Sequence, residues 1–312
     1  MSVWNKLDGS VRQSLTDQIE EMAAFCAASR CTVHVLLDCG DIDVLPVEPS
    51  RLRQVPDEYF AQETSLAPHL LTLSGSDDGA LLREVLAVAV TQAPSRTSPQ
   101  GIGAVLLAPT GADALLRHFV MLGLQYDPKG SSHVFRYQDP RVMQRVWPSL
   151  ASTQRDVWLG PVRRWIGAAQ PTGRIVDPPS IEASLWHASP NGMSDLPFAR
   201  PHRLLDSEQW QLAHSAPAEA AFWLLAHEAA DANHQFRPCP AIGTLRGWLN
   251  EAAAHRLGTN DQCEWALCRW ATDANSWESP SGQQQVYAAL ELQRRHAGLG
   301  FGDAWRTAST RA

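Results

Sequence analysis

The sequence has almost no lysine and no long apolar run. Of its 26 lysine and arginine residues, only Lys6 and Lys129 are lysines. No apolar stretch approaches the roughly 20 residues that are needed to cross a bilayer. Residues 1–6 also lack the basic start and the apolar core of a signal peptide. We therefore expect no membrane insertion and a cytoplasmic location.

Cysteines with a paired short spacing are also absent. The six cysteines are scattered, which favours reduced thiols that mostly fill the core of a cytoplasmic protein over disulfides or a zinc site. Cys263, for example, shares a predicted helix face with Leu267 and Trp270. The cysteines are Cys26, Cys31, Cys39, Cys239, Cys263 and Cys268.

Positive charge is scarce overall but is concentrated in one segment. The net charge of −7 makes nucleic acid an improbable partner, because phosphate binding requires a basic surface. Residues 1–80 hold five basic and thirteen acidic residues, whereas residues 117–164 hold eight basic and three acidic ones. Arginine is favoured at protein interfaces. The alternative explanation for most of this skew is a coding bias toward arginine.

Motifs for catalysis or cofactor binding are missing. Gly75–Gly79 is a plain turn rather than the Gly-x-Ser-x-Gly elbow of a hydrolase. Gly101-Ile102-Gly103 lacks the third glycine of a dinucleotide loop and is better explained by close backbone packing. A metal cluster could be imagined from His214, His227, His234 and Cys239, but surface positions are the preferred interpretation. We therefore predict no catalytic residue, no cofactor and no metal.

The order of predicted elements favours an α/β plus all-α fold in two lobes. Strands alternate with helices in the first half, and the second half is helical. We expect an α/β lobe over residues 1–168, a Pro- and Gly-rich crossing over 169–203, and a helical lobe over 204–312. Strands are predicted at 33–38, 70–73, 101–108 and 133–137. In the first half, helices are predicted at 11–28, 79–92 and 111–124, the last capped by Thr110. In the second half, we expect a short helix after Asp206 and longer helices at 215–232, 244–257, 261–274 and 280–297.

The segment from Phe135 to Val142 is the most informative part of the chain. Its alternation predicts a half-buried strand, with Phe135 and Tyr137 on the face opposite Arg136. Asp139 then stands as the N-cap of a helix that begins at Pro140. Arg136 and Arg141 are both expected to reach Asp139 across this corner. The preferred interpretation is a structural salt bridge; the alternative is a docking site for an acidic or C-terminal segment of a partner.

Four ordered pieces of sequence around this corner resemble the adaptor, or effector-chaperone, family of bacterial type VI secretion. A first strand ends in Asp38, and a second is introduced by Pro68. The helix 115–119 precedes the corner. Trp158-Leu159-Gly160-Pro161 follows it, where the family usually shows aromatic residues before Gly-Pro. The resemblance covers residues 30 to 166; His69 and Leu159 stand where the family more often has aromatic residues.

The resemblance implies a non-enzymatic adaptor that holds a toxin effector protein and loads it onto the VgrG spike protein. Two alternatives remain, an immunity-type protein that binds a toxin but no spike, and an enzyme (a hydrolase or transferase) with a site between the lobes. Trp158 and Trp165 are expected to be partly exposed, because arginine and tryptophan together are typical of interface hot spots. The candidate structural or partner-binding residues are Arg117, Arg136, Asp139, Arg141, Arg145, Trp158, Arg163, Arg164 and Trp165.

Overall fold

The chain folds into two compact units that divide within one long helix, α6 (Ser207–Asn233). Described residues up to Ala213 belong to the first unit, and those from His214 onward to the second. The computed structural model describes residues 2–38, 45, 47–56, 67–74, 78–93, 101–126, 130–169, 185–190, 204–233, 240–272, 274–296 and 298–310.

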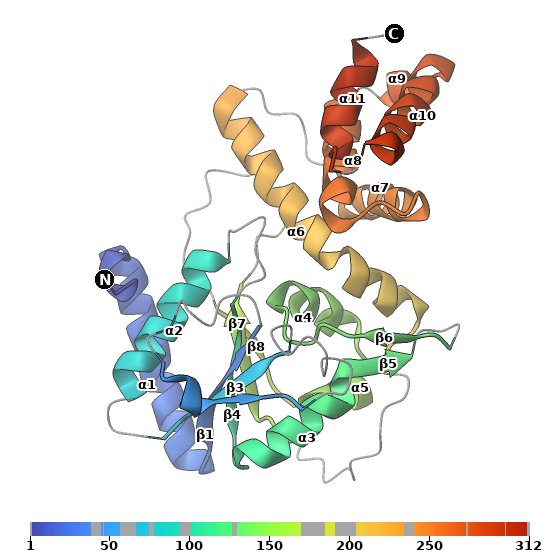
Figure 1. Ribbon diagram of the computed structural model, residues 1–312. Coiled ribbons are helices and arrows are strands. Elements are labelled where there is room, and N and C mark those ends of the chain that lie inside the picture. The colour runs from blue at the N-terminus through green and yellow to red at the C-terminus, as the bar shows by residue number, and fades with distance from the viewer. Residues whose placement is uncertain are drawn as a thin grey trace. The chain divides into compact units, whose positions relative to one another are not determined.

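The first unit is built on a six-stranded sheet in the order β2-β3-β1-β4-β7-β8 (Figure 1). Every neighbouring pair is antiparallel, and in the centre Val35 of β1 lies opposite both Leu71 of β3 and Val105 of β4. The strands are β1 (Thr32–Leu37), β2 (Leu52–Gln54), β3 (His69–Leu73), β4 (Ile102–Ala108), β7 (Arg164–Ala168) and β8 (Leu185–Ala188).

Two helices, α1 (Gly9–Ser29) and α2 (Asp78–Gln92), cover one face of this sheet. Because side chains alternate along a strand, Val35 and Leu37 of β1 point to this face and pack with Leu15 of α1. All three side chains are almost completely buried.

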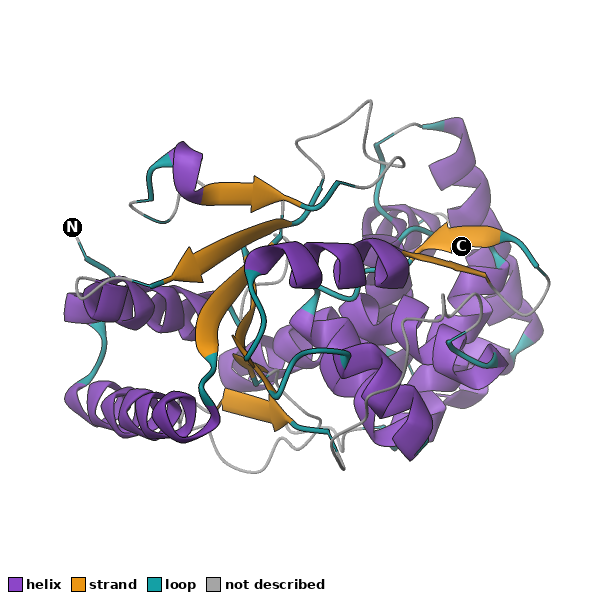
Figure 2. Ribbon diagram, turned by 90° about the horizontal axis from the view of Figure 1, so that it is seen from below, coloured by secondary structure: helices purple, strands orange, loops and turns teal. Residues whose placement is uncertain are grey.

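The opposite face is covered by α3 (Ala112–Gly123) and by the segment that follows it, so helices lie on both sides of the strands (Figure 2). Along β7, Trp165 contacts Phe119 of α3, whereas the preceding residue, Arg164, stacks over Phe25 of α1 on the other side. The segment after α3 contains the hairpin β5 (Leu124–Tyr126) and β6 (Ser132–Val134), then α4 (Pro140–Val146), a 3-10 turn (Trp147–Ser149) and α5 (Ser152–Leu159).

The second unit is helical and is held together by aromatic side chains. One cluster joins Phe222 and Trp223 of α6 to later helices, and another centres on Trp265, Trp277 and Phe301. Cys263 is buried with Leu267 and Trp270, as predicted. The helices after α6 are α7 (Ile242–Ala254), α8 (Thr259–Ala271), α9 (Ala274–Glu278), α10 (Pro280–Arg295) and α11 (Phe301–Ser309).

The predicted α/β plus all-α fold class is confirmed, but several boundaries differ. The two helices expected after Asp206 and from Ser215 are one helix, α6, with Pro217 inside it. Ala216 and Ala218 on either side of this proline are fully buried, so packing outweighs the lost backbone hydrogen bond. The cap of α3 is Gly111 rather than Thr110, and it makes no side-chain cap bond.

The predicted crossing, residues 169–203, lies mostly outside the described residues, but it contains the strand β8, which pairs with β7. Residues 204–213, which we assigned to the helical lobe, fall in the first unit. Within the part of the chain that the structure describes, every helix is too short or too polar to cross a membrane.

Candidate functional site

The corner between β6 and α4 is built as a tight turn on a helix N-terminus. The strand ends at Val134, three residues earlier than predicted, because Tyr137 and Asp139 donate their backbone N–H groups to turn carbonyls instead of to a neighbouring strand. The predicted faces are confirmed: Phe135 and Tyr137 are buried, and the side chain of Arg136 is 43% exposed. Asp139 caps α4 through a bond from the Arg141 N–H to Oδ1 (3.0 Å).

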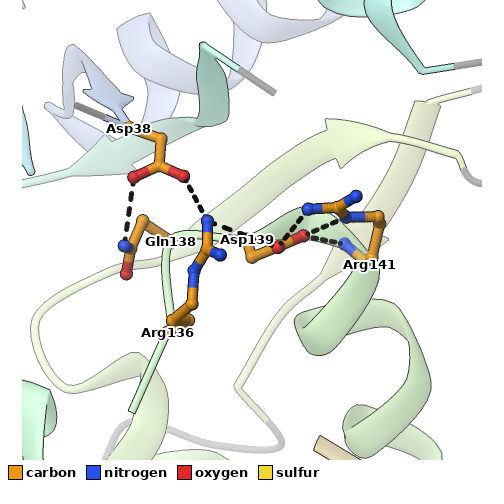
Figure 3. A network of polar contacts seen from close by, with 5 residues as sticks. All are labelled: Asp38, Arg136, Gln138, Asp139 and Arg141. Carbon is orange, nitrogen blue, oxygen red and sulfur yellow. Dashed lines mark hydrogen bonds and ion pairs between the residues drawn. The ribbon is translucent and has the colours of Figure 1, made fainter. Parts of the chain in front are cut away.

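Asp139 is the centre of an ion network, as the sequence predicts (Figure 3). Arg141 donates from Nε to Oδ1 (2.9 Å) and from Nη2 to Oδ2 (2.8 Å), the two-point geometry that matches a guanidinium to a carboxylate. Nη2 of Arg136 lies 3.7 Å from Oδ2. Asp139 is 1% exposed and Arg141 7%, so this pair is held away from water.

A second buried carboxylate, Asp38 at the end of β1, completes the network. Arg136 donates from Nη2 to Asp38 Oδ2 (2.7 Å), and Gln138 donates from Nε2 to Oδ1 (3.2 Å). Arg136 therefore bridges two buried carboxylates from a half-exposed position (Figure 3). Sequence analysis did not assign these roles to Asp38 and Gln138. An acid directly after a buried strand was the available signal, because a buried charge requires a partner.

The electrostatics of Asp139 favour the charged form. Burial by itself raises the pKa of the carboxyl group, since it penalises the charge. The hydrogen bonds and charge of Arg141, with the charge of Arg136, outweigh burial and hold the pKa of Asp139 below its ordinary value. Asp139 is therefore a fixed anion and hydrogen-bond acceptor at neutral pH.

Two glycines of the sheet let the corner approach it closely. Gly103 lies at an irregularity in the β1–β4 pairing, and a Cβ there would overlap the carbonyl oxygen of Gln138 and lie 3.2 Å from that of Leu36. At Gly167 of β7 a Cβ would lie 3.6 Å from Pro140. The expectation that Gly103 serves close backbone packing is thus confirmed.

Replacing Gly103 with alanine is expected to destabilise the first unit by about 1–3 kcal/mol, because both opposing atoms belong to backbone that cannot rotate away. The free energy of unfolding from chemical denaturation measures the loss. Gly79→Ala on α2 is the matched control, since a Cβ there meets nothing within 4 Å. A Gly103→Ala protein as stable as the Gly79→Ala protein would show that the corner does not rest on β4.

Buried aromatic side chains pack against the corner. Tyr137 stacks on Phe119 (ring centroids 5.2 Å apart), and Phe135 contacts Trp158 edge-on (5.0 Å). The expectation that Trp158 and Trp165 are partly exposed is wrong, because they are 0% and 1% exposed. Packing against Phe135 and Phe119 accounts for both.

The other predicted arginines lie at four further positions of the first unit. Arg164 faces α1, where Nη1 lies 2.6 Å from Glu21 Oε1. Arg163 is half-buried and donates its backbone N–H to Leu107 (2.8 Å). Arg117 is exposed on α3, and Arg145 is half-buried in the last turn of α4. The structure therefore brings together Arg136, Asp139 and Arg141, and it separates Arg164 from them by the thickness of the sheet.

His118 of α3 is a buried titratable group that sequence analysis did not single out. Its Nε2–H donates to the carbonyl of Trp158 (2.8 Å), and its ring fills the space in which a Cβ of Gly160 would lie. Gly160 also has a φ of +52°, which glycine adopts readily. Burial lowers the pKa of His118 to about 4, so the ring is neutral at physiological pH.

The imagined metal cluster cannot be assembled from the described side chains. His214 is exposed on α6, while the side chains of His227, His234 and Cys239 lie outside the described residues. Among the described residues, His, Cys, Asp and Glu side chains do not come together in threes that could hold a metal ion.

Comparison with known proteins adds one finding. No curated protein and no solved structure matches the chain. One family model matches residues 54–157, from the end of β2 into α5, and so includes Arg136, Asp139 and Arg141 but not Asp38. Over these residues the chain is similar to the family described as "Domain of unknown function (DUF4123)".

Proposed function

We propose that this protein is a non-enzymatic adaptor that binds a toxin effector in the bacterial cytoplasm and loads it onto the VgrG spike of a type VI secretion system. The ordered resemblance from Val33 to Val162 supports this function. The family match over residues 54–157 supports the same segment as a domain, although its description names no activity.

The observation that carries the proposal is the way Arg136 is held. Its side chain is 43% exposed, yet its guanidinium is held by the buried carboxylates of Asp38 and Asp139. A cation that is fixed before binding loses little side-chain entropy when a partner docks. Arginine in such a position is typical of the residues that dominate protein interfaces.

The chemistry of the corner suits binding better than proton transfer. A general acid or base works best when its pKa lies near the operating pH. The pKa of Asp139 is instead lowered, and both its oxygens accept bonds from Arg141. The corner supplies a rigid scaffold with one cation at its surface.

Co-purification tests the proposal. The tagged full-length protein is recovered from its native cytoplasm, and bound proteins are identified by mass spectrometry. We expect a spike protein and one large toxin, with Arg136→Gln lowering the recovery of at least one of them about tenfold, the effect of losing one charged hot-spot contact. Arg83→Gln, an exposed arginine on α2, is the matched control and should retain both.

Other results of the co-purification would contradict the adaptor function. A toxin without a spike protein would replace the adaptor function with the immunity-type function. Recovery of neither would contradict both. Because Arg136→Gln also removes a partner of buried Asp38, the melting temperatures of the variants are compared, and Arg136→Lys retains the charge as a second variant.

A further inference from the structure

The six arginines that the structure describes in the helical unit fall into two groups. Four of them form ion pairs within the unit, on the surface or between helices. Arg256 and Arg294 form none with any residue that the structure describes. The four paired arginines are Arg246 (with Glu219), Arg269 (with Glu251 and Glu278), Arg295 (with Glu291) and Arg306 (with Asp303).

Both unpaired arginines line the same cavity. It has a volume of about 530 Å³ and lies among the end of α7, the start of α8 and the last turns of α10. Leu257 and Leu290, which are 8% and 3% exposed, supply apolar lining, and Asp261 is the only acidic residue that lines it. Oδ1 of Asp261 already accepts a bond from the backbone N–H of Phe301 (3.0 Å).

Arg256 has a left-handed backbone conformation just after the end of α7. The residue follows α7 with a φ of +63°, a conformation for which glycine is the usual choice. The helix dipole of α7 favours a cation at this position. It does not explain why a second unpaired cation, Arg294 of α10, lines the same cavity. Two exposed arginines that line one cavity, and that form no ion pair with any described carboxylate, including Asp261, can hold an external anion.

We infer that this cavity binds the carboxylate of an acidic side chain in a peptide segment of a partner protein. Arg256 and Arg294 hold the carboxylate, because the planar guanidinium matches its two oxygens. The aliphatic stem of a glutamate lies against Leu257 and Leu290. The site goes beyond the proposed function, since it does not require the partner to be an effector or a spike.

Fluorescence anisotropy with the full-length protein tests this inference. The probes are a fluorescein-labelled octaglutamate peptide and the matching octaglutamine peptide. We expect only octaglutamate to bind, and we expect Arg256→Gly and Arg294→Gln each to weaken binding about tenfold, as loss of a charged hydrogen bond does. Glycine at 256 suits the positive φ, so this variant keeps the fold. Arg295→Gln, the neighbouring arginine that pairs with Glu291, should bind as the parent does.

Three results would overturn the inference. These are equal binding or no binding of the two peptides, equal losses in Arg295→Gln and Arg294→Gln, or displacement of octaglutamate by inorganic phosphate far more effectively than by acetate at equal ionic strength. The last would mark a general anion site rather than a carboxylate site.

Discussion

Replacing Asp139 with asparagine is expected to lower the free energy of unfolding of the first unit by about 3–5 kcal/mol, the usual cost of removing one partner from a buried ion pair. Arg141, which is 7% exposed, would remain in the protein without the anion that accepts its two side-chain bonds. Asparagine is itself a good N-cap, so most of the loss would come from the ion network rather than from the cap of α4.

The matched control is Asp113→Asn on α3. Asp113 pairs with Arg53 at 2.5 Å, but its side chain is 72% exposed, so solvent screens the pair and its loss should change stability little. Guanidinium denaturation followed by tryptophan fluorescence gives both values. Equal losses at Asp139 and Asp113 would contradict a structural role for the corner.

A second substitution tests whether the loss of stability comes from the unpaired positive charge of Arg141. Adding Arg141→Met to Asp139→Asn removes the uncompensated guanidinium and replaces it with an apolar chain of similar length. The double variant is therefore expected to be more stable than Asp139→Asn alone, because a buried ion pair can often be replaced as a whole at little cost. If the double variant is less stable still, Arg141 stabilises the fold through contacts other than Asp139.

The corner could be predicted because its signals are local. An N-cap aspartate followed by proline fixes where α4 begins, and the alternation before it places Phe135 and Tyr137 in the core. Arg136 and Arg141 lie within three residues of Asp139, so short-range geometry is enough to bring them together.

The long-range partners could not be predicted in the same way. Asp38 and Arg136 are 98 positions apart, and only the pairing of β1 with β4, together with the approach of Gln138 to Gly103, sets them side by side. Arg164 and Trp165 were grouped because they are adjacent in sequence. Because β7 is a strand, the side chains of these two consecutive residues point to opposite faces of the sheet.

Short strands and the continuous α6 were missed for a related reason. β2 and β5 each have three residues, too few for a periodic pattern to stand out. In α6, Pro217 is a strong local signal for a helix boundary, but burial of its neighbours overrides that signal.

Acidification from pH 6.5 to pH 4 is expected to lower the stability of the first unit by about 3 kcal/mol through His118 alone. Burial lowers the pKa of His118 to about 4 in the folded protein, although its bond to the Trp158 carbonyl acts in the opposite direction. In the unfolded chain the pKa returns to about 6.5. As the pH falls, the unfolded state therefore takes up a proton first, and each unit of the difference costs about 1.4 kcal/mol.

The sign follows from the direction of the pKa shift: the contribution is fully present above pH 6.5, declines as the pH falls to about 4, and is constant below that. His118→Gln removes the titration and can still donate a hydrogen bond, so its stability relative to the parent should rise by about 3 kcal/mol over this range. Acid effects from Asp139 and other carboxylates are common to both proteins and cancel in the difference. Parallel profiles for the parent and His118→Gln would mean that His118 is protonated without cost, and hence that the ring is not held neutral between α3 and Gly160.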